Sequence, residues 1–580
     1  MLTLREFQQP LLSHPLTPAG PIPTAQDPDG VYPYESFVET SRRPVLRAFR
    51  FVAMENDHLR VVICPDLGGK VHSLYLKRAQ RETLYVSPAV HPIRILPRGA
   101  YVGGGIEVSF PISHTPVQIE PVLCRAETRG ERAYVWCGER ELRFGMHWTV
   151  EYSLGRDDAF LTQRTVFFNP AATAHPWMSW SNAGVLARPD TEFHFPKGPV
   201  LKHGDKMQII TWETEGPKRQ ADIDRMAGFF WRDASVCAFG AFTPSLGCGL
   251  YHIADPKLTP GIKLWSDGVG KHEPWVSQYT LAGEQVLEIQ AGPLVDQSIK
   301  DHLQPQQRRY HVEFWIPSDK PLDIDALQLP RPELAPLDDV PRFGWARKPE
   351  VERWESVLAA HTKQARAQLP APPDVTDNHW APCGMEALGD ALRWAAESSA
   401  APQKDAWLFQ LGAWRAGRNE IDAALDALRA SGDDRARALA GRLLRRHKQD
   451  ARAAVESFRA IQSETFALHP QVVFERDLAL AELGAETFAE RERWLDAVVG
   501  LDDEWLIERR AVLLVDAGKF ADAKRLLEST RFQLVHQRYA RTRLWTRIKA
   551  ELGITTPDPP NWLGEDDLAE FGAYREYQED

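Results

Sequence analysis

The fold is decided where the sequence YHVEFWIPSDKPLDIDALQLPRPELAPLDDVPRFGW (310–345) changes its pattern. Residues 310–316 alternate between apolar and polar side chains, which is typical of a half-buried β-strand. Residues 318–345 are rich in Pro and Asp and follow neither the strand period nor the helix period. We therefore expect an extended linker over 318–345 that separates two domains of different kinds.

Upstream of this linker, residues 45–317 consist of short β-type runs broken by Gly, Pro, Asn and Asp. Examples are LRVVI (59–63), MHWTVEYSL (146–154) and VLEIQAG (286–292). Runs of this length and spacing are typical of sandwiches and barrels, and no helix-length periodic run interrupts them. We expect one large antiparallel β-sandwich over 45–317, preceded by an N-terminal arm over 1–44.

Downstream, the chain is rich in Ala, Leu, Arg and Glu with a period of 3.6 residues. The stretches DAWLFQLGAWRAGRNEIDAALDALRA (405–430) and WLIERRAVLLVDAGKFADAKRLLEST (505–530) each pair two helices across a Gly-containing turn. This is the layout of tetratricopeptide-like (TPR-like) helical hairpins. We expect α-helical repeats over 346–555 and a tail over 556–580. We expect these repeats to cover the sandwich or to form a homodimer contact, in preference to binding a protein partner.

Composition excludes several classes of function. The chain has 69 Lys and Arg against 80 Asp and Glu, a formal net charge of −11, so it lacks the basic field that nucleic acid or an anionic membrane requires. Its six cysteines include no CxxC pair, so we expect neither a zinc site nor a disulfide framework, and no metal-binding residue or cofactor is predicted, although the sequence leaves open whether a metal is needed. No stretch approaches the roughly 18 apolar residues of a membrane span, and the first residues do not resemble a signal peptide. The sequence therefore predicts a cytoplasmic protein.

Four segments of the β-rich region carry polar and aromatic side chains at unusual density. They are residues 98–116, 175–190, 249–270 and 286–298. Sugar sites combine an aromatic platform with short polar groups that bind hydroxyls, and these segments contain that mixture. The candidates for lining a sugar site are His114, His175, Trp180, Asn182, His252, Asp255, Lys263 and Trp265. The alternative interpretation is a set of polar turns over an aromatic core.

Two carboxylates are candidates for chemistry. Glu107 follows three consecutive glycines, which let the backbone approach a ligand closely. A glycine bulge with a solvent-facing Glu is the alternative interpretation of the same sequence. In VLEIQAGPLVDQS (286–298), alternation places Glu288 and Gln290 on one face of a strand. A lone Glu in a strand commonly lies on a wet face, but the following Gly-Pro and the polar neighbouring segments favour a functional Glu288.

These residues resemble a known family. GGGIEVSFPISH (103–114) resembles the GGIPVCFP-type segment of hexose-phosphate epimerases in the galactose mutarotase-like superfamily. NDHLRVVICPDLGGKVHSLYLK (56–77) is similar to that superfamily's opening strands, and VLEIQAGPLVD (286–296) to its late strand bearing the catalytic Glu. The resemblance covers about residues 45–317 and implies a β-supersandwich with a concave carbohydrate site. With its helical repeats, the chain resembles a bacterial family that joins a mutarotase-like domain to tetratricopeptides.

Departures from the epimerase pattern shift the expected reaction. The resemblance implies that Glu288 is the base that takes the proton from the anomeric hydroxyl. The stretch MSWSNAGV (178–185), where the epimerase acid would stand, has no His, and only His175 lies nearby; Glu107 replaces the epimerase-type Pro. Glycosidic cleavage needs two carboxylates. We therefore predict a glycoside hydrolase acting on short oligosaccharides or glycosides, with Glu107 as general acid and Glu288 as base or nucleophile.

Two other functions stay open on the sequence. One is an aldose or sugar-phosphate 1-epimerase that uses Glu288 as base and His175 or His114 as acid. The other is a non-catalytic carbohydrate-binding module whose repeats recruit a protein. The same scaffold can host all three activities, so the fold does not separate them.

Overall fold

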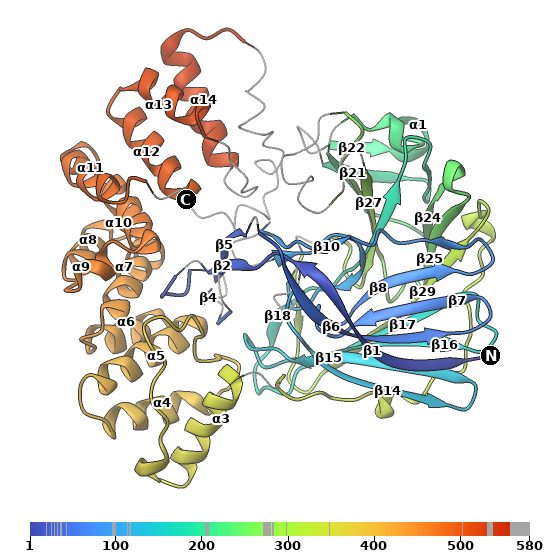
Figure 1. Ribbon diagram of the computed structural model, residues 1–580, viewed down its shortest axis with the longest axis horizontal. Coiled ribbons are helices and arrows are strands. Elements are labelled where there is room, and N and C mark those ends of the chain that lie inside the picture. The colour runs from blue at the N-terminus through green and yellow to red at the C-terminus, as the bar shows by residue number, and fades with distance from the viewer. Residues whose placement is uncertain are drawn as a thin grey trace.

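Two layers of β-structure and an array of helices make up the chain in the computed structural model (Figure 1). The structure describes residues 1–18, 20–24, 26–27, 30–31, 33–34, 37–41, 43–94, 100–112, 114, 118–203, 208–224, 226–270, 280, 284–296, 299–346, 349–500, 503–530 and 538–556. The two large sheets pack face to face, and the helices cover one side of this sandwich.

The first sheet has 13 strands in the order β10-β1-β6-β7-β8-β13-β19-β27-β26-β23-β21-β22, with β9 added beside β8. Its strands are β1 (Thr3–Ser13), β6 (Val45–Glu55), β7 (Leu59–Cys64), β8 (Lys70–Leu76), β9 (Arg81–Glu82), β10 (Ala89–Val90), β13 (Gly105–Val108), β19 (Ser181–Ala187), β21 (Pro199–His203), β22 (Gln208–Thr211), β23 (Ala227–Trp231), β26 (Gly261–Ser266) and β27 (Gln285–Gly292). All neighbours are antiparallel except β1 and β10.

The second sheet has eight strands in the order β14-β15-β16-β17-β29-β25-β24-β20. They are β14 (Leu123–Arg129), β15 (Arg132–Arg140), β16 (His147–Gly155), β17 (Leu161–Phe168), β20 (Glu192–His194), β24 (Cys237–Thr243), β25 (Cys248–Ala254) and β29 (Arg308–Ser318). Smaller pairs are β2 (Leu16–Pro18) with β5 (Phe37–Thr40), β3 (Gln26–Asp27) with β4 (Gly30–Val31), β11 (Ile93–Arg94) with β12 (Ala100–Tyr101), and β18 (His175–Trp177) with β28 (Asp301–Leu303). A single-turn helix, α1, spans Trp212–Glu215.

The main hydrophobic core lies between the two sheets. Ile106, Ala183 and Ile289 of the first sheet are fully buried there, together with Val135 and Val150 of the second. Because side chains alternate along a strand, the residues next to Ile106, Ala183 and Ile289 face away from this core. That alternation sets up a second, outward face of the 13-stranded sheet, on which polar side chains gather.

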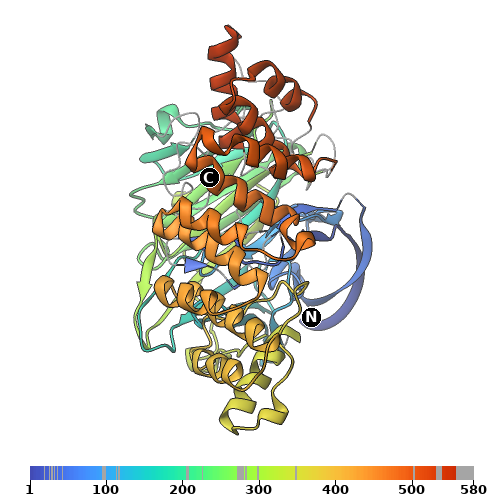
Figure 2. The same ribbon diagram turned by 90° about the vertical axis from the view of Figure 1, so that its left-hand side faces the viewer.

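Within the described ranges, the helical domain contains twelve helices, most of which pack against the next helix along the chain. The helices are α3 (Pro349–Thr362), α4 (Leu388–Glu397), α5 (Gln403–Gly417), α6 (Ile421–Arg429), α7 (Asp434–Lys448), α8 (Ala451–Arg459), α9 (Glu464–Ala467), α10 (Pro470–Leu483), α11 (Phe488–Ala497), α12 (Glu504–Asp516), α13 (Phe520–Glu528) and α14 (Arg538–Leu552). Figure 2 shows them stacked in an array in front of the sandwich. The predicted fold class, a large β-sandwich followed by TPR-like helical hairpins, is confirmed. Within the described ranges, no helix has the length and apolar character needed to cross a bilayer.

Residues 319–346, in the predicted linker region, are held along the second sheet. Arg164 donates a hydrogen bond to the carbonyl of Ala335 at 2.9 Å, and the Thr149 hydroxyl donates to the carbonyl of Pro341 at 2.8 Å. The amide of Arg140 donates to the carbonyl of Gly344 at 2.8 Å. Backbone groups that a free linker would leave to water are thus paired with strands β15, β16 and β17.

The first helices continue the core of the sandwich. Phe144, in the turn between β15 and β16, belongs to the same buried cluster as Leu388 and Trp414. The amide of Gly384 donates to the carbonyl of Leu142 at 2.9 Å at this junction. A continuous apolar contact of this kind makes the helical domain part of the sandwich's packing rather than a separately tethered unit.

The region predicted as an N-terminal arm supplies a strand and a clasp. β1 pairs with β6 over its whole length, although its side chains are mostly exposed and it contains a Pro, which explains why its sequence carries no strand signal. Further on, the backbone of Ile22 exchanges two hydrogen bonds with the Gln471 side chain of α10, at 3.1 and 2.8 Å. Arg442 of α7 donates to the carbonyl of Thr24. The arm is thereby fixed against the helices.

Candidate functional site

Four neighbouring strands place a row of polar side chains on the outward face of the 13-stranded sheet. The register pairs Glu107 with Asn182, Asn182 with Gln290, and Gln290 with Lys263. Adjacent strands lie about 4.8 Å apart, so the row is continuous. Each of the four side chains is at most 5% exposed. Burying so many polar groups together is costly unless they are paired or bind something, so this row is the first part of the candidate site.

A second row, two residues along, places Glu288 beside the first. Glu288 pairs with Gly184 on one side and with Trp265 on the other, and Trp265 pairs in turn with Gly228. The indole of Trp265 lies over Gly228, because a Cβ at Gly228 would come within 2.6 Å of its ring atoms. Likewise a Cβ at Gly184 would come within 2.7 Å of Gly104. Glycines therefore let the indole and the glycine turn lie directly on the sheet.

Glu288 is half-buried, and both of its oxygens accept hydrogen bonds. The hydroxyl of Tyr101, from β12, donates to Oε1, and the amide of Gln290 donates to Oε2 at 2.9 Å. Burial, reinforced by the nearby carboxylates Glu288 and Glu107, raises the pKa of Tyr101 well above its usual value. Tyr101 therefore stays protonated at neutral pH and serves Glu288 as a donor.

Glu107 keeps one oxygen without a partner. Its Oε1 lies 2.9 Å from Nδ1 of His114 and accepts a long hydrogen bond, 3.5 Å, from the Asn182 amide. Among the described residues, nothing pairs with Oε2 of Glu107 or with Oδ1 of Asn182, although both atoms are buried. Both oxygens are therefore able to accept a further hydrogen bond, and they lie on the same face of the sheet. The His114 ring also meets the Tyr101 ring edge-on at 5.1 Å, which links the two carboxylates.

Two buried lysines flank the carboxylates. Lys70 of β8 donates to the carbonyl of Val102 at 2.9 Å, and the ammonium of Lys263 lies 4.8 Å from the Phe230 ring centre. Burial lowers the pKa of Lys70, while attraction to Glu107 and then to Glu288 opposes the shift. Burial also lowers the pKa of Lys263, to about 8, against the attraction of Glu288. Lys263 is therefore mainly charged at neutral pH, and both lysine side chains interact with the two carboxyl groups.

Five of the predicted lining residues lie in or beside the two rows. The structure brings together His114, Asn182, Lys263 and Trp265 around the predicted pair Glu107 and Glu288. Trp180 stands on the same face two residues before Asn182, fully buried, with its indole against Gly261 and Gly292.

The other three lie elsewhere. His252 is fully buried between the sheets, 3.1 Å from Glu313, and Asp255 follows it in a turn where it accepts a hydrogen bond from the Lys257 amide. His175 lies at the junction with the helices, where its ring stacks on Phe144 at 4.9 Å. Burial, and then the charges of two nearby arginines, lower the pKa of His175 to about 4. The structure does not join these three side chains to the carboxylate pair.

Three residues of the cluster were not among the predicted site residues: Lys70, Tyr101 and Gln290. The sequence did contain a signal for Lys70, because it lies in a largely apolar strand and Lys is almost never fully buried without a partner. Gln290 shares a face with Glu288 by alternation alone. No group of three His, Cys, Asp or Glu side chains within the described ranges is arranged to hold a metal ion.

Comparison with known proteins places the chain among relatives. A family model described as a domain of unknown function, DUF5107, matches residues 26–318, and a model of a C-terminal domain matches residues 354–548. The crystal structure of a TPR-domain containing protein from Parabacteroides distasonis is 49% identical, covers 98% of both chains and has a TM-score of 0.94. A galactose mutarotase-like protein from Clostridium acetobutylicum is 13% identical over 47% of this chain and 95% of its own, with a TM-score of 0.35. The Slr1438 protein from Synechocystis is 14% identical over 49% and 99%, with a TM-score of 0.37.

Proposed function

The chain belongs to the DUF5107 family, and we propose that it is a carbohydrate-active enzyme, a glycoside hydrolase that cleaves short oligosaccharides or glycosides. A mutarotase-like fold fits a carbohydrate-related function. The observation that carries the proposal is the pair Glu107 and Glu288 on one sheet face, beside two buried oxygens that lack partners, Glu107 Oε2 and Asn182 Oδ1. A sugar hydroxyl would donate to Asn182 Oδ1, and Trp265 on the same face offers an apolar surface for a sugar ring.

In this proposal Glu107 is the general acid. Its Oε1 is held by His114 and Asn182, which leaves Oε2 to present a proton to the leaving oxygen of the glycoside. Glu288 acts as the base. Tyr101 and Gln290 donate to its two oxygens and fix its orientation, and each carboxylate oxygen has a further lone pair with which to orient an attacking water. Glu107 thus gives its proton to the leaving oxygen, while Glu288 takes a proton from the water that attacks the anomeric carbon.

The strand order favours inversion at the anomeric carbon. Glu107 and Glu288 stand on strands separated by β19 and in adjacent rows, which places their Cα atoms about 12 Å apart. Retaining pairs need carboxyl groups about 5–5.5 Å apart, whereas inverting pairs use about 6.5–9.5 Å to make room for a water. Each carboxyl group is hydrogen-bonded to its own neighbours and not to the other carboxyl group, which is compatible with the wider pair.

The test is to incubate the purified full-length protein with a panel of disaccharides and aryl glycosides and to follow the products by proton NMR. Cleavage in which the first-formed sugar has the opposite anomeric configuration supports the proposal with its stereochemistry. Cleavage with retention of the anomeric configuration would support hydrolase activity but contradict the inverting mechanism. Binding without turnover across the panel would instead support a non-catalytic carbohydrate-binding module.

A sugar 1-epimerase is the second candidate, favoured by one observation. His114, with 15% of its side chain exposed, lies in the same cluster as Glu288 and touches Tyr101, which donates to Glu288. An acid and a base on either side of a sugar would suffice to open and close its ring. Faster exchange between α and β forms of a free sugar or sugar phosphate, with no glycoside cleaved, would select this reaction over hydrolysis.

A further inference from the structure

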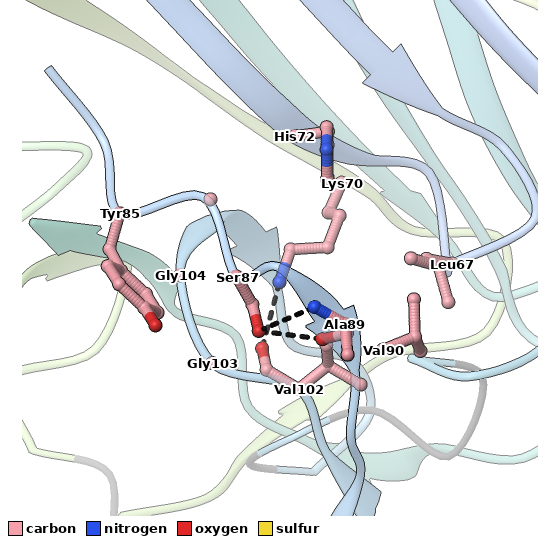
Figure 3. A pocket seen from close by; sticks show the side chains of 11 residues that line it. Leu67, Lys70, His72, Tyr85, Ser87, Ala89, Val90, Val102, Gly103 and Gly104 are labelled. Carbon is pink, nitrogen blue, oxygen red and sulfur yellow. Dashed lines mark hydrogen bonds between the residues drawn. The ribbon is translucent and has the colours of Figure 1, made fainter. Parts of the chain in front are cut away.

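A small pocket lies beside the carboxylates, at the glycine turn formed by Gly103, Gly104 and Gly105. It encloses about 280 Å³, including space open to solvent. Because that figure includes open space, the pocket has room for a small substituent of a ligand rather than for a whole ligand. Figure 3 shows Lys70 reaching from β8 towards the Val102 carbonyl at this turn.

The lining of the pocket carries one positive charge and no carboxylate. Lys70 is 4% exposed, and the described residues give its three N–H donors one partner, the carbonyl of Val102. His72 also lines the pocket; burial, and then the charge of Lys70, lower the pKa of His72 to about 4. His72 is therefore neutral near pH 7, which leaves Lys70 as the cationic side chain among the lining residues that the structure describes.

Backbone donors are available in the same wall. Within the part of the chain that the structure describes, the amides of Gly103 and Gly104 donate to no hydrogen-bond partner. Gly104 has a φ of 77°, a left-handed conformation that a side chain would oppose, and a Cβ there would come within 2.1 Å of the Tyr85 carbonyl oxygen. Successive amides at a glycine turn can bind an anion, and here the two glycines line the same pocket as Lys70.

The ammonium of Lys70 also belongs to the catalytic face. Ile106 pairs with Val71, so Lys70 stands beside Glu107 on the outward face of the sheet. Its charge interacts with both Glu107 and Glu288. A group bound to Lys70 would therefore be carried by the same sugar that lies between the two carboxylates.

We propose that this pocket binds the carboxylate of a uronic acid, so that the substrate of the hydrolase is an acidic glycoside. The inference rests on the proposed function. A carboxylate carries one negative charge and matches the single ammonium, whereas a phosphate monoester carries about −1.5 to −2 and would call for more than one cation. Lys70 and the amides of Gly103 and Gly104 would hold the carboxylate oxygens.

The first test varies the ligand and uses the wild-type protein. Isothermal titration calorimetry would compare D-glucuronate and D-galacturonate with D-glucose, D-galactose, D-glucuronamide and D-glucose 6-phosphate. We expect at least one uronate to bind about 10- to 100-fold more tightly than its neutral counterpart, and glucuronamide to bind no better than glucose, because charge-assisted hydrogen bonds are the strong ones. Equal binding of uronate and neutral sugar, binding of neither uronate, or tighter binding of the phosphate would each overturn the proposal.

The second test varies the protein. Lys70→Met should abolish the preference for uronate, while Lys257→Met, which removes an exposed lysine, should keep it. Circular dichroism would confirm that both variants are folded; should Lys70→Met not fold, the glucuronamide comparison still decides. Retention of the preference by folded Lys70→Met would overturn the proposal.

The two proposals fail in different ways. Cleavage of neutral glycosides without any preference for uronates would support the proposed hydrolase activity and contradict the proposed role of the pocket. Tight uronate binding with no cleavage of uronate-containing glycosides would support the proposed uronate pocket and contradict the proposed hydrolase activity.

Discussion

Glu313 and Glu107 are both buried glutamates of the β-domain with a histidine partner, but their oxygens are used differently. Glu313 lies between the sheets, and both its oxygens are occupied by donors from three strands of the second sheet and one of the first. These contacts are His252 at 3.1 Å, His311 at 3.1 Å, Gln163 at 2.9 Å and Ser181 at 2.6 Å. Glu107 faces outward from the same sandwich with Oε2 unpaired.

The difference separates a structural carboxylate from a candidate catalytic one. Burial alone opposes the charge of Glu313, but hydrogen bonds from His252 and His311, together with their charges, outweigh it and lower its pKa to about 2. Both of its oxygens accept hydrogen bonds that join the sheets. A carboxylate with an unused oxygen has capacity left for a ligand, so a histidine partner by itself does not identify an active site.

The largest effect is expected for Glu288→Gln, on the outward face. The amide keeps the shape and loses the charge and basicity, so turnover should fall by about 10²–10⁴-fold while the thermal midpoint barely moves. Initial rates on a cleaved glycoside, with a melting curve of the same sample, measure both. A variant that retains more than about a tenth of the wild-type rate would make Glu288 a structural residue like Glu313.

Glu107→Gln should distinguish between leaving groups. A general acid matters only where the leaving oxygen needs a proton, so kcat/KM should fall by about 10²-fold or more on natural glycosides and much less on an aryl glycoside with a good leaving group. The comparison uses both substrates on one preparation. Equal activity of wild type and variant on both would remove Glu107 from the mechanism and leave its glycine turn as a structural feature.

Glu313→Gln should give the opposite result from these two variants. A neutral amide cannot accept from all four donors as a carboxylate does, so the free energy of unfolding should fall by about 3 kcal/mol, typical of breaking a buried charged network. Turnover measured well below the unfolding temperature should stay within a few-fold of wild type. Urea titration and initial rates test this; an unchanged urea midpoint with lost turnover would reverse the roles assigned to the two glutamates.

The smallest expected effect is on the stability of the protein at acidic pH. Because the pKa of Glu313 is lowered from 4.5 to about 2 on folding, its contribution to stability is present above pH 4.5 and is lost as the pH falls from 4.5 through about 2. The thermal midpoint of wild type should therefore drop more steeply over this range than that of Glu313→Gln. Parallel slopes for the two proteins would show that this carboxylate does not carry the acid sensitivity.

The sequence predicted the two-domain architecture because periodicity is local. The helix period after residue 350 and the strand runs before 317 are visible in any short window, and both were confirmed. β1 was missed because its exposed, Pro-containing sequence has no apolar alternation. Its pairing with β6 depends on residues some forty positions away, which no local pattern records.

The site could be predicted only in part, since its geometry depends on register. Alternation places Glu288 and Gln290 on one face, but it does not say which strand lies beside them. The segment 249–270 illustrates the limit: His252 and Trp265 are close in sequence, yet β25 belongs to the second sheet and β26 to the first. Trp265 therefore lies beside Glu288, and His252 lies in the core beside Glu313. The catalytic roles of Glu107 and Glu288 stay predictions.

The hydrogen bonds of Ile22 and Thr24 to the helices also have a consequence for folding during synthesis on the ribosome. Ile22 is held by Gln471, a residue 449 positions later in the chain. At about 5–20 residues per second, a ribosome needs roughly 20–90 s to reach this partner after Ile22 has been made. During that interval the β-domain can assemble its sheets, but Ile22 and Thr24 have no helices to bind. A late closing step thus joins the arm around Ile22 to a helical domain that is made after the β-domain.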